Sequence, residues 1–253
     1  MLKAVFFDLD GTLLRIDEKG FSELYFKLLG AKLEPYGYEP EMLPKLFYQG
    51  MAQMMYNDGT RNNEEAFFSF FKVIYPQAEE DIPIFNSFYT NEFKQIASIC
   101  EKTPLSKEIV DFVKEKGLIP VLSTNPIFPL VAQRTRSEIA GINPDDFAYI
   151  TGYEDSYFCK PNPLYFKALL EKFNLKSDEV IVFGNNDFED GDCASALGLK
   201  VYLIDGYLIH SSHAKGKYET IELNQVIPTI EKEIEKRKTQ TVRQSQERGN
   251  VVD

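Results

Sequence analysis

The chain has 253 residues, of which 43% are hydrophobic, enough for one large domain or for a core with a smaller module. Its formal net charge of −11 argues against a general nucleic-acid-binding protein, because such proteins grip phosphate backbones with a surplus of Lys and Arg. A small anionic substrate remains compatible with this charge, since a bound metal ion can outweigh the overall field at its own site.

The cysteines and histidines argue against several kinds of site. Cys100, Cys159 and Cys193 are far apart and odd in number, so they form neither a disulfide framework nor a zinc pattern. His210 and His213 are more typical of a polar loop than of a transition-metal site. No apolar run reaches the ~18 residues of a membrane-spanning helix, and the initial apolar strand leaves no room for a signal peptide. We therefore expect a soluble cytoplasmic protein.

The first predicted element is a buried parallel strand that ends in two aspartates, within Val5-Phe6-Phe7-Asp8-Leu9-Asp10-Gly11-Thr12. A short apolar run bounded by turn residues is typical of such a strand. Alternation turns Asp8 and Asp10 to the same side, at the carboxyl end where open α/β sheets bind their ligands. Carboxylates this close repel each other, so the pair requires a cation, a proton or a very wet site. The alternative is an ordinary Asp-Gly turn after a strand.

Residues 17–103 lack strand–helix alternation, and we expect them to form a mostly helical insert. Apolar residues recur there at helical spacing, as in Phe21, Leu24, Tyr25, Leu28 and Leu29, and again in Ala66, Phe67, Phe70, Phe71 and Ile74. Half of the aromatic residues of the chain, 17 of 34, fall between Phe21 and Phe93. We expect these rings to form the core of the insert rather than a base-stacking surface.

From about residue 104 onward the pattern is α/β. Helices are predicted at Leu105–Lys116, Leu130–Ala140, Pro163–Phe173 and Asp190–Leu197, and strands at Leu118–Leu122, Phe147–Ile150, Val180–Phe183 and Lys200–Ile204. Strands that alternate with ~10-residue helices indicate crossover units and a parallel sheet. The polar segment from Glu233 to Asp253 is expected to be a frayed helix end or a disordered tail.

Polar side chains follow two more of the predicted strands. The strand ending at Leu122 leads into Ser123-Thr124-Asn125-Pro126, whose hydroxyls and amide can bind an anion without adding negative charge. The segment Phe158-Cys159-Lys160-Pro161-Asn162-Pro163 places a lysine at the entrance to a helix, where the prolines stiffen the chain and the helix amino terminus favours an anion. Taken alone, each segment is also compatible with ordinary turn chemistry or a surface lysine.

The strand ending at Phe183 leads into a dense set of oxygen-bearing side chains, Gly184-Asn185-Asn186-Asp187-Phe188-Glu189-Asp190-Gly191-Asp192. Mg²⁺ takes oxygen ligands, typically one or two carboxylates with water and substrate oxygens. Alone, this segment is compatible with a polar loop and a helix cap. Together with Asp8 and Asp10 it could complete a cation site.

The four segments resemble the motifs of the haloacid dehalogenase-like (HAD) hydrolase superfamily, in residues and in order. The resemblance covers roughly residues 3–15 and 104–205, and it is most specific for Asp8-Leu9-Asp10-Gly11-Thr12 and Lys160-Pro161-Asn162-Pro163. It implies a Rossmann-like three-layer α/β core with a parallel sheet at 1–16 and 104–230. It also implies a mostly α-helical cap domain at 17–103, which leaves a polar C-terminal tail at 231–253.

The resemblance further implies a catalytic mechanism. Asp8 would attack phosphorus and form an aspartyl-phosphate, and Asp10 would protonate the leaving group and then deprotonate the attacking water. Thr124, or by the less favoured register Ser123, would hydrogen-bond the phosphoryl group, and Lys160 would neutralise charge on it. An acid at position 10 favours phosphate esters over carbon–halogen bonds, because a leaving alkoxide needs a proton.

The resemblance also implies Mg²⁺ between the Asp8 carboxylate, the Asp10 backbone carbonyl, the last motif and the substrate. That motif departs from the family pattern of two acidic residues. One register pairs Asn186 with Asp190, and a shift by one pairs Asp187 with Asp192. Asp187 has the better charge for a metal and Asp190 the better helix phase, so both registers stay open.

Further substrate contacts are predicted around the catalytic residues and in the cap. Gly11, Thr12 and Asn125 are expected to bind the substrate, and Arg61 is a candidate for a second anionic group; it and Arg15 are otherwise plain surface arginines. In such enzymes the cap closes over the core, excludes water and selects the leaving group.

The predicted function is therefore Mg²⁺-dependent hydrolysis of a small phosphomonoester through an aspartyl-phosphate. We expect a small phosphorylated metabolite as the partner, and neither nucleic acid nor a membrane. The alternatives are a phosphoglucomutase-like phosphoryl transferase and a catalytically weak regulatory binding protein on the same scaffold.

Overall fold

Short apolar runs separated by helices build one parallel sheet. The computed structural model describes residues 1–16, 18–101 and 103–249, and within these residues six strands follow the spatial order β3-β2-β1-β4-β5-β6. Neighbouring strands are parallel throughout. The strands are β1 (Ala4–Phe7), β2 (Ile119–Leu122), β3 (Tyr149–Ile150), β4 (Val180–Gly184), β5 (Lys200–Ile204) and β6 (Glu219–Ile221).

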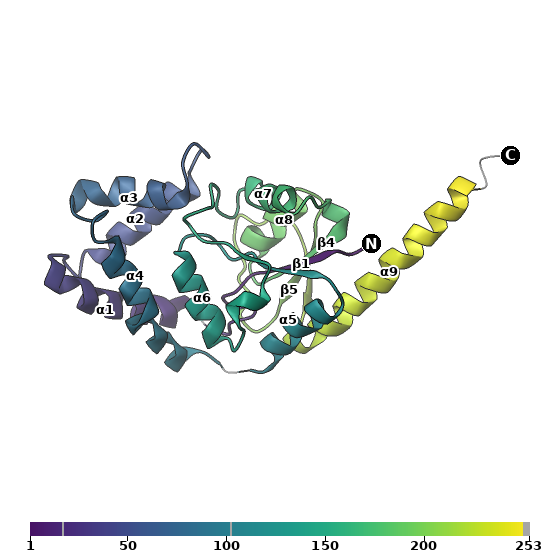
Figure 1. Ribbon diagram of the computed structural model, residues 1–253, viewed down its shortest axis with the longest axis horizontal. Helices are drawn as coiled ribbons and strands as arrows, with labels where there is room; N and C mark the ends of the chain where they lie inside the picture. The colour runs from purple at the N-terminus through teal and green to yellow at the C-terminus, as the bar shows by residue number, and fades with distance from the viewer. Residues whose placement is uncertain (17, 102, 250–253) are drawn as a thin grey trace.

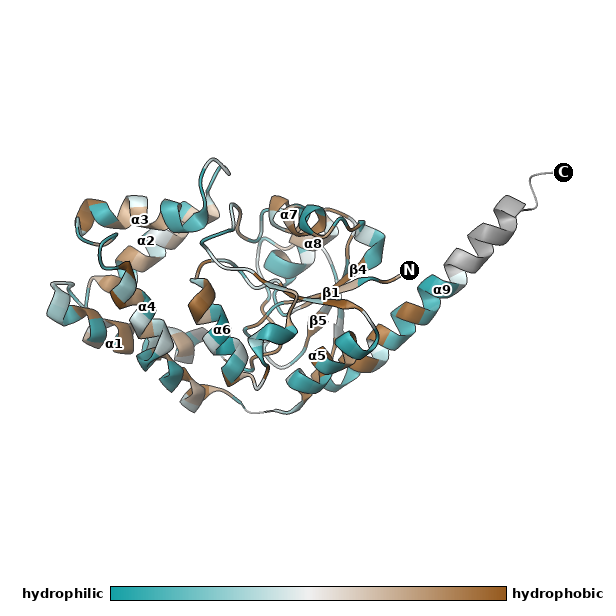
Figure 2. Cartoon of the chain, in the orientation of Figure 1, coloured by the Kyte–Doolittle hydropathy of each residue, from teal (hydrophilic) through white to brown (hydrophobic). Residues whose placement is uncertain are grey.

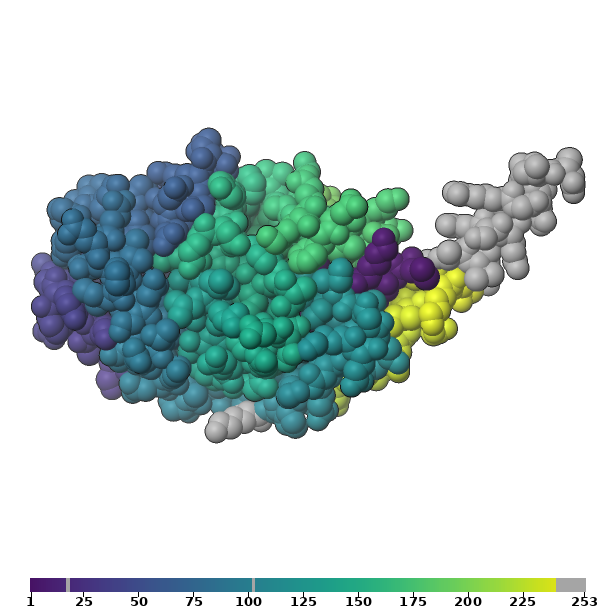
Figure 3. Space-filling view, in the orientation of Figure 1, coloured from purple at the N-terminus to yellow at the C-terminus, as the bar shows by residue number. Residues whose placement is uncertain are grey.

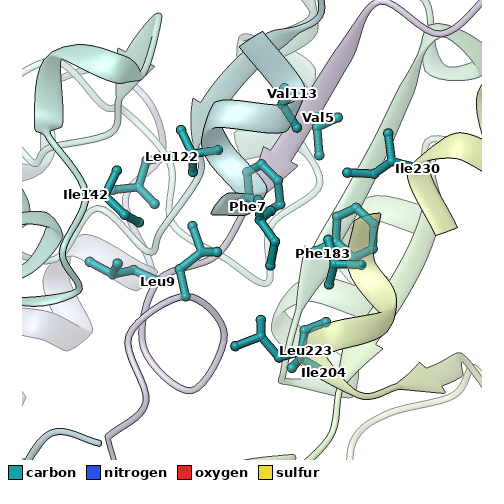
Figure 4. Packing of buried hydrophobic residues seen from close by; sticks show 14 of the residues in the cluster. Val5, Phe7, Leu9, Val113, Leu122, Ile142, Phe183, Ile204, Leu223 and Ile230 are labelled. Atoms are coloured by element: carbon teal, nitrogen blue, oxygen red, sulfur yellow. The ribbon is translucent and has the colours of Figure 1, made fainter. Parts of the chain in front are cut away.

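Helices cover both faces of the sheet, which makes three layers (Figure 1). They are α5 (Leu105–Glu115), α6 (Leu130–Ile139), α7 (Leu164–Lys172), α8 (Cys193–Ser195) and α9 (Val226–Gly249). Val5 and Phe7 of β1 pack on one face with residues of α5 and α9, including Val113 and Ile230 (Figure 4). The intervening residue, Phe6, packs on the other face against α7 and α8. Alternation along a strand buried on both faces explains why β1 is apolar at every position.

The insert after β1 folds as the separate helical layer that the sequence predicts, and we call residues 18–101 the cap. Its helices are α1 (Glu18–Leu33), α2 (Leu43–Met55), α3 (Asn63–Ile74) and α4 (Ile82–Thr90), followed by a 3₁₀ helix, Glu92–Ile99. Figure 2 shows both hydrophobic and hydrophilic residues on these helices. Figure 3 shows the purple and blue surface of the cap adjoining the teal and green surface of the core.

Aromatic rings form the core of the cap, as expected from their helical spacing. Phe47, Phe67 and Phe71 pack at ring-centroid separations of 5.1–5.2 Å. At Gly50 of α2 an added Cβ would lie 2.6 Å from the Phe67 ring, so a glycine is needed for the approach of α2 to α3. The start of α3 is fixed by Asn62, which accepts a hydrogen bond from the Glu65 amide and completes a capping box.

Two elements differ from the sequence expectation. The helix predicted at Asp190–Leu197 is a π-helical turn, Asp187–Asp192, that leads into the short α8. It begins early because the Asn186 side chain accepts hydrogen bonds from the amides of Phe188 and Glu189. Strand β6 is not predicted by the sequence pattern, since it has three residues and only Ile221 is buried.

The predicted boundary of the tail at residue 231 falls inside α9. Glu233 is only 3% exposed, and its carboxylate accepts a hydrogen bond from the Tyr202 hydroxyl of β5 at 3.0 Å. Arg237 pairs with Glu233 at 3.3 Å and donates to the carbonyl of Val180. The first turns of this polar helix therefore pack on the sheet, while residues 250–253 lie outside the described part of the chain. None of the described helices is both long and apolar enough to cross a membrane.

Candidate active site

Three adjacent strands bring the predicted motifs to one edge of the sheet. Because β2, β1 and β4 are parallel neighbours, the residues that follow them meet at their carboxyl ends. Asp8 follows β1, Thr124 follows β2, and Asn185 follows β4. Together with Asp10, Asn125, Asn186, Glu189, Asp190 and Arg136 they line a cleft of about 200 Å³.

Lys160 is buried next to this cleft, between the carboxylates of two lining residues, Asp8 and Asp190. Its side chain is 1% exposed, and its Nζ donates to Asp8 Oδ1 at 3.0 Å and to Asp190 Oδ1. Burial opposes the positive charge, but the carboxylates of Asp190 and Asp8 outweigh it and raise the pKa of Lys160 well above its usual value. The amide of Asn125 bridges to the Lys160 backbone, accepting from its N–H and donating to its carbonyl. The ammonium is therefore charged and fixed in place.

Asp8 is the carboxylate between Lys160 and the open part of the cleft. Burial raises the pKa of Asp8 to about 7, against the lowering effect of Lys160, and the charges of Asp190 and Asp10 raise it further. One oxygen of this carboxylate accepts from Lys160, and Asp8 itself is part of the cleft lining. This is the arrangement that a nucleophile beside a neutralising cation requires.

Asp190 holds the loop after β4 against the lysine. Its Oδ2 accepts hydrogen bonds from the backbone amides of Asn185 and Asn186, both at 3.1 Å, and its Oδ1 accepts from Lys160. An added Cβ at Gly184 would lie 2.2 Å from the Asp190 carboxyl carbon, so glycine is required at the end of β4. Because both oxygens of Asp190 already bind protein donors, this residue is better suited to position Lys160 than to hold a metal.

A second buried cation, which the sequence motifs do not reveal, pairs with Asp10. Arg136 of α6 is 1% exposed, and its guanidinium donates to Asp10 Oδ2 and to Gln133 Oε1. It also lies over the Phe128 ring, 4.6 Å from the centroid. The two neighbouring aspartates of the first motif thus each have their own cation, which resolves the repulsion expected from their spacing.

One signal could have identified Arg136 from sequence. The run Gln133-Arg134-Thr135-Arg136-Ser137 leaves this helix without a full apolar stripe, and four of these five residues are buried in the structure. Its low hydrophobic content next to a motif is therefore a sign of a polar buried network.

The other predicted site residues divide between the cleft and its surroundings. Thr124 lines the cleft, and its carbonyl is held by the hydroxyls of Thr151 and Tyr165. The hydroxyl of Ser123 instead donates to the carbonyl of Phe7 inside the sheet. Gly11 has φ +76°, and a Cβ there would lie 2.0 Å from the Asn185 amide, which explains the glycine after Asp10.

Thr12 and the two arginine candidates lie away from the cleft lining. The Thr12 hydroxyl is buried and has no hydrogen-bond partner in the described residues. Arg61 is exposed in the loop between α2 and α3, where it donates to Ser69 at 2.9 Å. Arg15 pairs with Glu101 at 2.9 Å and lies over the Tyr207 ring.

Of the residues predicted to hold a metal, Asp8, Asp10, Asn186 and Asp190 line the cleft and Asp187 does not. Asp187 lies outside the cleft, because its carboxylate binds His210 Nδ1 at 2.9 Å and the amide of Ser211 at 2.8 Å. Within the described part of the chain, no group of three or more His, Cys, Asp and Glu side chains is arranged as a metal cluster. Mg²⁺ commonly uses only one or two protein carboxylates, with water and substrate oxygens completing its shell.

The cleft does offer such a donor set. Asp10 Oδ1 is buried with no hydrogen-bond partner in the described residues, and Asp8 lies beside it. Asn186 and Glu189 line the same opening, where Asn186 Oδ1 also accepts from the amides of Phe188 and Glu189 and Glu189 Oε2 accepts from Asn125. The donors are all oxygens, so the residues fit a hard divalent cation.

Several known proteins share this fold. A HAD phosphatase from Thermococcus onnurineus is 17% identical, with a TM-score of 0.58, and 90% of this chain and 98% of that chain are covered. CbbY from Rhodobacter sphaeroides in complex with phosphate is 17% identical, with a TM-score of 0.55 and 87% and 94% covered. L-2-haloacid dehalogenase from Xanthobacter autotrophicus is 14% identical, with a TM-score of 0.56 and 91% and 99% covered.

At these identities the likeness concerns the fold. No curated protein matches the sequence. The family model for haloacid dehalogenase-like hydrolases matches residues 2–198, a span that holds all four motif segments and most of the chain. The protein therefore belongs to the haloacid dehalogenase-like hydrolase family.

Proposed function

We propose that the protein is a Mg²⁺-dependent phosphatase that hydrolyses a small phosphomonoester through an aspartyl-phosphate. The observation that carries the proposal is the pair of first-motif carboxylates, each bound to a separate buried cation in one cleft. Asp8 lies 3.0 Å from Lys160 Nζ, and Asp10 is bound by Arg136. Such a site can accept a dianionic phosphate because its own charges are neutralised.

In the first half-reaction an oxygen of Asp8 attacks phosphorus, and the bond between phosphorus and the ester oxygen breaks. Asp10 gives its proton to the leaving oxygen, so an alcohol is released. In the second half-reaction water attacks the aspartyl-phosphate, Asp10 takes the water proton, and Asp8 is regenerated. Binding of Asp10 Oδ2 by Arg136 orients the carboxyl and leaves Oδ1 for proton transfer.

The remaining residues position the phosphoryl group. Lys160 neutralises charge on the transferring group, and Thr124 donates a hydrogen bond to it. The groups that would hold Mg²⁺ are the Asp8 carboxylate and the Asp10 backbone carbonyl, with Asn186 and Glu189 at the same opening. When bound, the metal supplies charge neutralisation between the carboxylates and the phosphate. We assign to Asp190 the positioning of Lys160, and to Asp187 the support of the loop at residues 210–211.

The substrate class that we propose is a small phosphorylated metabolite of the cytoplasm. The acid at position 10 favours an oxygen leaving group, since a halide leaves without a proton. A mutase would retain the aspartyl-phosphate against water and require a bisphosphate activator, whereas steady release of phosphate is the result expected here.

The test is phosphate release from p-nitrophenyl phosphate, with and without Mg²⁺. Asp8→Asn keeps the shape of the side chain but removes the nucleophile, so we expect turnover to fall by about 10⁴-fold or more. Asp145→Asn, at an aspartate that is 72% exposed, is the control and should match the wild type. Absence of metal-dependent phosphate release from every ester in a broad panel would refute the proposal.

A further inference from the structure

A second cavity, of about 260 Å³, lies on the cap side of Asp10. Eleven of its sixteen lining residues are aromatic, and they come from the cap and from the segments after β2 and β3. Asp10 is the one charged residue in this lining, and no lysine, arginine or histidine among the described residues belongs to it. The cavity therefore presents apolar ring surface next to the proposed acid/base.

The cavity is continuous with the catalytic cleft. Asp10, Met51, Ile127 and Phe128 line both spaces, and Asp8 is among the other lining residues of the cleft. A phosphate bound beside Asp8 would have its ester oxygen near Asp10, and the alcohol part of the substrate would continue past Asp10. The position of the cavity is thus that of a leaving-group site.

The tyrosine hydroxyls of Tyr25, Tyr89 and Tyr153 in the lining already have hydrogen-bond partners, which leaves Asp10 as the polar group at the cleft end of the cavity. The hydroxyls of Tyr25 and Tyr89 hydrogen-bond each other at 2.8 Å, and the hydroxyl of Tyr153 binds the Glu64 carboxylate. A polyol placed here would lose its water contacts and find few free partners, which is unfavourable in a buried space. An aryl or cyclic hydrocarbon group would instead pack against ring faces and edges.

The size and exposure of the lining also distinguish the cavity from a packing defect. Protein interiors are close-packed, with few voids larger than a water molecule. Here Phe21, Phe26 and Phe128 are only partly buried, and Tyr48 is 52% exposed. A volume of about 260 Å³ lies just below the ~300 Å³ at which ligand pockets begin, and the partly accessible aromatic lining matches theirs.

We propose that this cavity binds the leaving group, and that the substrate is a phosphate monoester of an uncharged, ring-bearing alcohol. The inference rests on the proposed phosphatase activity and narrows its substrate class. Hydrolysis breaks the bond between phosphorus and the ester oxygen; the water oxygen stays on the phosphate, and a proton goes to the released alcohol.

The first experiment compares kcat/KM for 2-phenylethyl phosphate, ethyl phosphate and glycerol phosphate on the wild-type protein. The phenylethyl and ethyl compounds are both primary alkyl esters, so their intrinsic reactivities are similar. Burial of the phenyl ring should favour 2-phenylethyl phosphate over ethyl phosphate by roughly 30- to 100-fold. Equal values for these two esters, or a preference for glycerol phosphate, would overturn the inference.

Variants at two serines test whether the preference arises in this cavity. Ser22 of α1 lines the cavity, and Ser22→Trp would fill part of it. We expect this variant to lose most of the preference through a higher KM for 2-phenylethyl phosphate. Ser98→Trp, at an exposed cap serine outside the lining, should keep the wild-type preference. A folded Ser22→Trp protein with the full preference, or its loss in Ser98→Trp, would contradict the assignment.

Binding to the Asp8→Asn protein separates the inference from the proposed reaction. Calorimetry should give tighter binding of 2-phenylethyl phosphate than of ethyl phosphate, by at least about tenfold, with a more negative heat-capacity change. This result without hydrolysis of any ester would reject the phosphatase proposal and retain the cavity assignment. Hydrolysis of both esters with equal affinity would reject the cavity assignment and retain the phosphatase.

Discussion

The edge of the sheet and the cap surround Asp10 with chemically different surfaces, one charged and one aromatic. At the sheet edge, buried charges stand in pairs, with Lys160 between Asp8 and Asp190 and with Arg136 on Asp10. In the cap the surface is made of rings, whose hydroxyls already have partners. In the proposed function this difference corresponds to a division of tasks, in which the strand ends would bind the phosphate by charge and the helical insert would select the rest of the substrate by shape and hydrophobicity.

The largest loss of activity and stability should come from removing the cation at the sheet edge. Lys160→Ala leaves the buried carboxylates of Asp8 and Asp190 without their shared partner. We expect about 10³-fold lower phosphatase turnover, and a loss of about 3–5 kcal/mol in the free energy of unfolding. Phosphate-release assays and urea denaturation measure the two effects. Lys167→Ala on the exposed face of α7 is the control, and wild-type turnover in Lys160→Ala would show that the lysine is not catalytic.

The second cation should matter less, because Arg136 acts through Asp10. Arg136→Met preserves the length of the side chain but removes both the pair with Asp10 and the donor to Gln133. We expect kcat to fall by about 10- to 100-fold, with partial recovery in Arg136→Lys. Arg134→Met, on the exposed side of the same helix, should leave kcat unchanged. Equal kinetics of the Met and Lys variants would argue against a role for the charge.

A smaller effect is expected on the metal side of the cleft. Asn186→Ala removes a candidate oxygen ligand and the cap of the π-helical turn, so the Mg²⁺ concentration for half-maximal activity should rise about tenfold. Asp187→Ala should leave that concentration unchanged, because its carboxylate binds the loop at 210–211. A reversed order in a Mg²⁺ titration would favour Asp187 as the ligand.

The smallest effect concerns the cap core. Gly50→Ala places a methyl group against the Phe67 ring, and we expect the protein to lose about 1–3 kcal/mol of stability through overpacking. Gln49→Ala, at the exposed neighbouring position, provides the reference in thermal unfolding. An unchanged unfolding temperature in Gly50→Ala would mean that α2 and α3 can move apart to accommodate the methyl group without a loss of stability.

The sequence predicts most of the fold because its signals are local. Apolar runs define β1, β2, β4 and β5, and helical spacing identifies the cap; the α/β class and the family are confirmed. What is missed depends on long-range contacts. The pairing of Arg136 with Asp10 joins residues 126 positions apart, and the orientation of Asp187 is set by amide and imidazole groups of a distant loop.

The candidate site was predictable to a similar degree. Asp8, Asp10, Thr124 and Asn125 follow strands, so the topology brings them to one cleft, and Lys160 at the entrance to a helix contacts Asp8; their roles stay predictions. The choice among Asn186, Asp187 and Asp190 depended on side-chain partners that spacing does not contain. The packing of Glu233 was missed for the same reason. Its polar sequence neighbours predict a tail, but its carboxylate accepts a hydrogen bond from Tyr202 of the sheet.

The location of Asp10 in the walls of two spaces has a consequence for the order of events after bond cleavage. In the proposed reaction, once the ester bond breaks the phosphoryl group is held on Asp8, on the charged side of Asp10, and the alcohol lies on the aromatic side. The alcohol and the phosphoryl group would then occupy two adjoining spaces, so neither would have to displace the other. We therefore expect the alcohol to stay bound while water enters from the charged side, and to inhibit turnover without competing with inorganic phosphate. Product-inhibition kinetics with the two compounds added together would measure this independence.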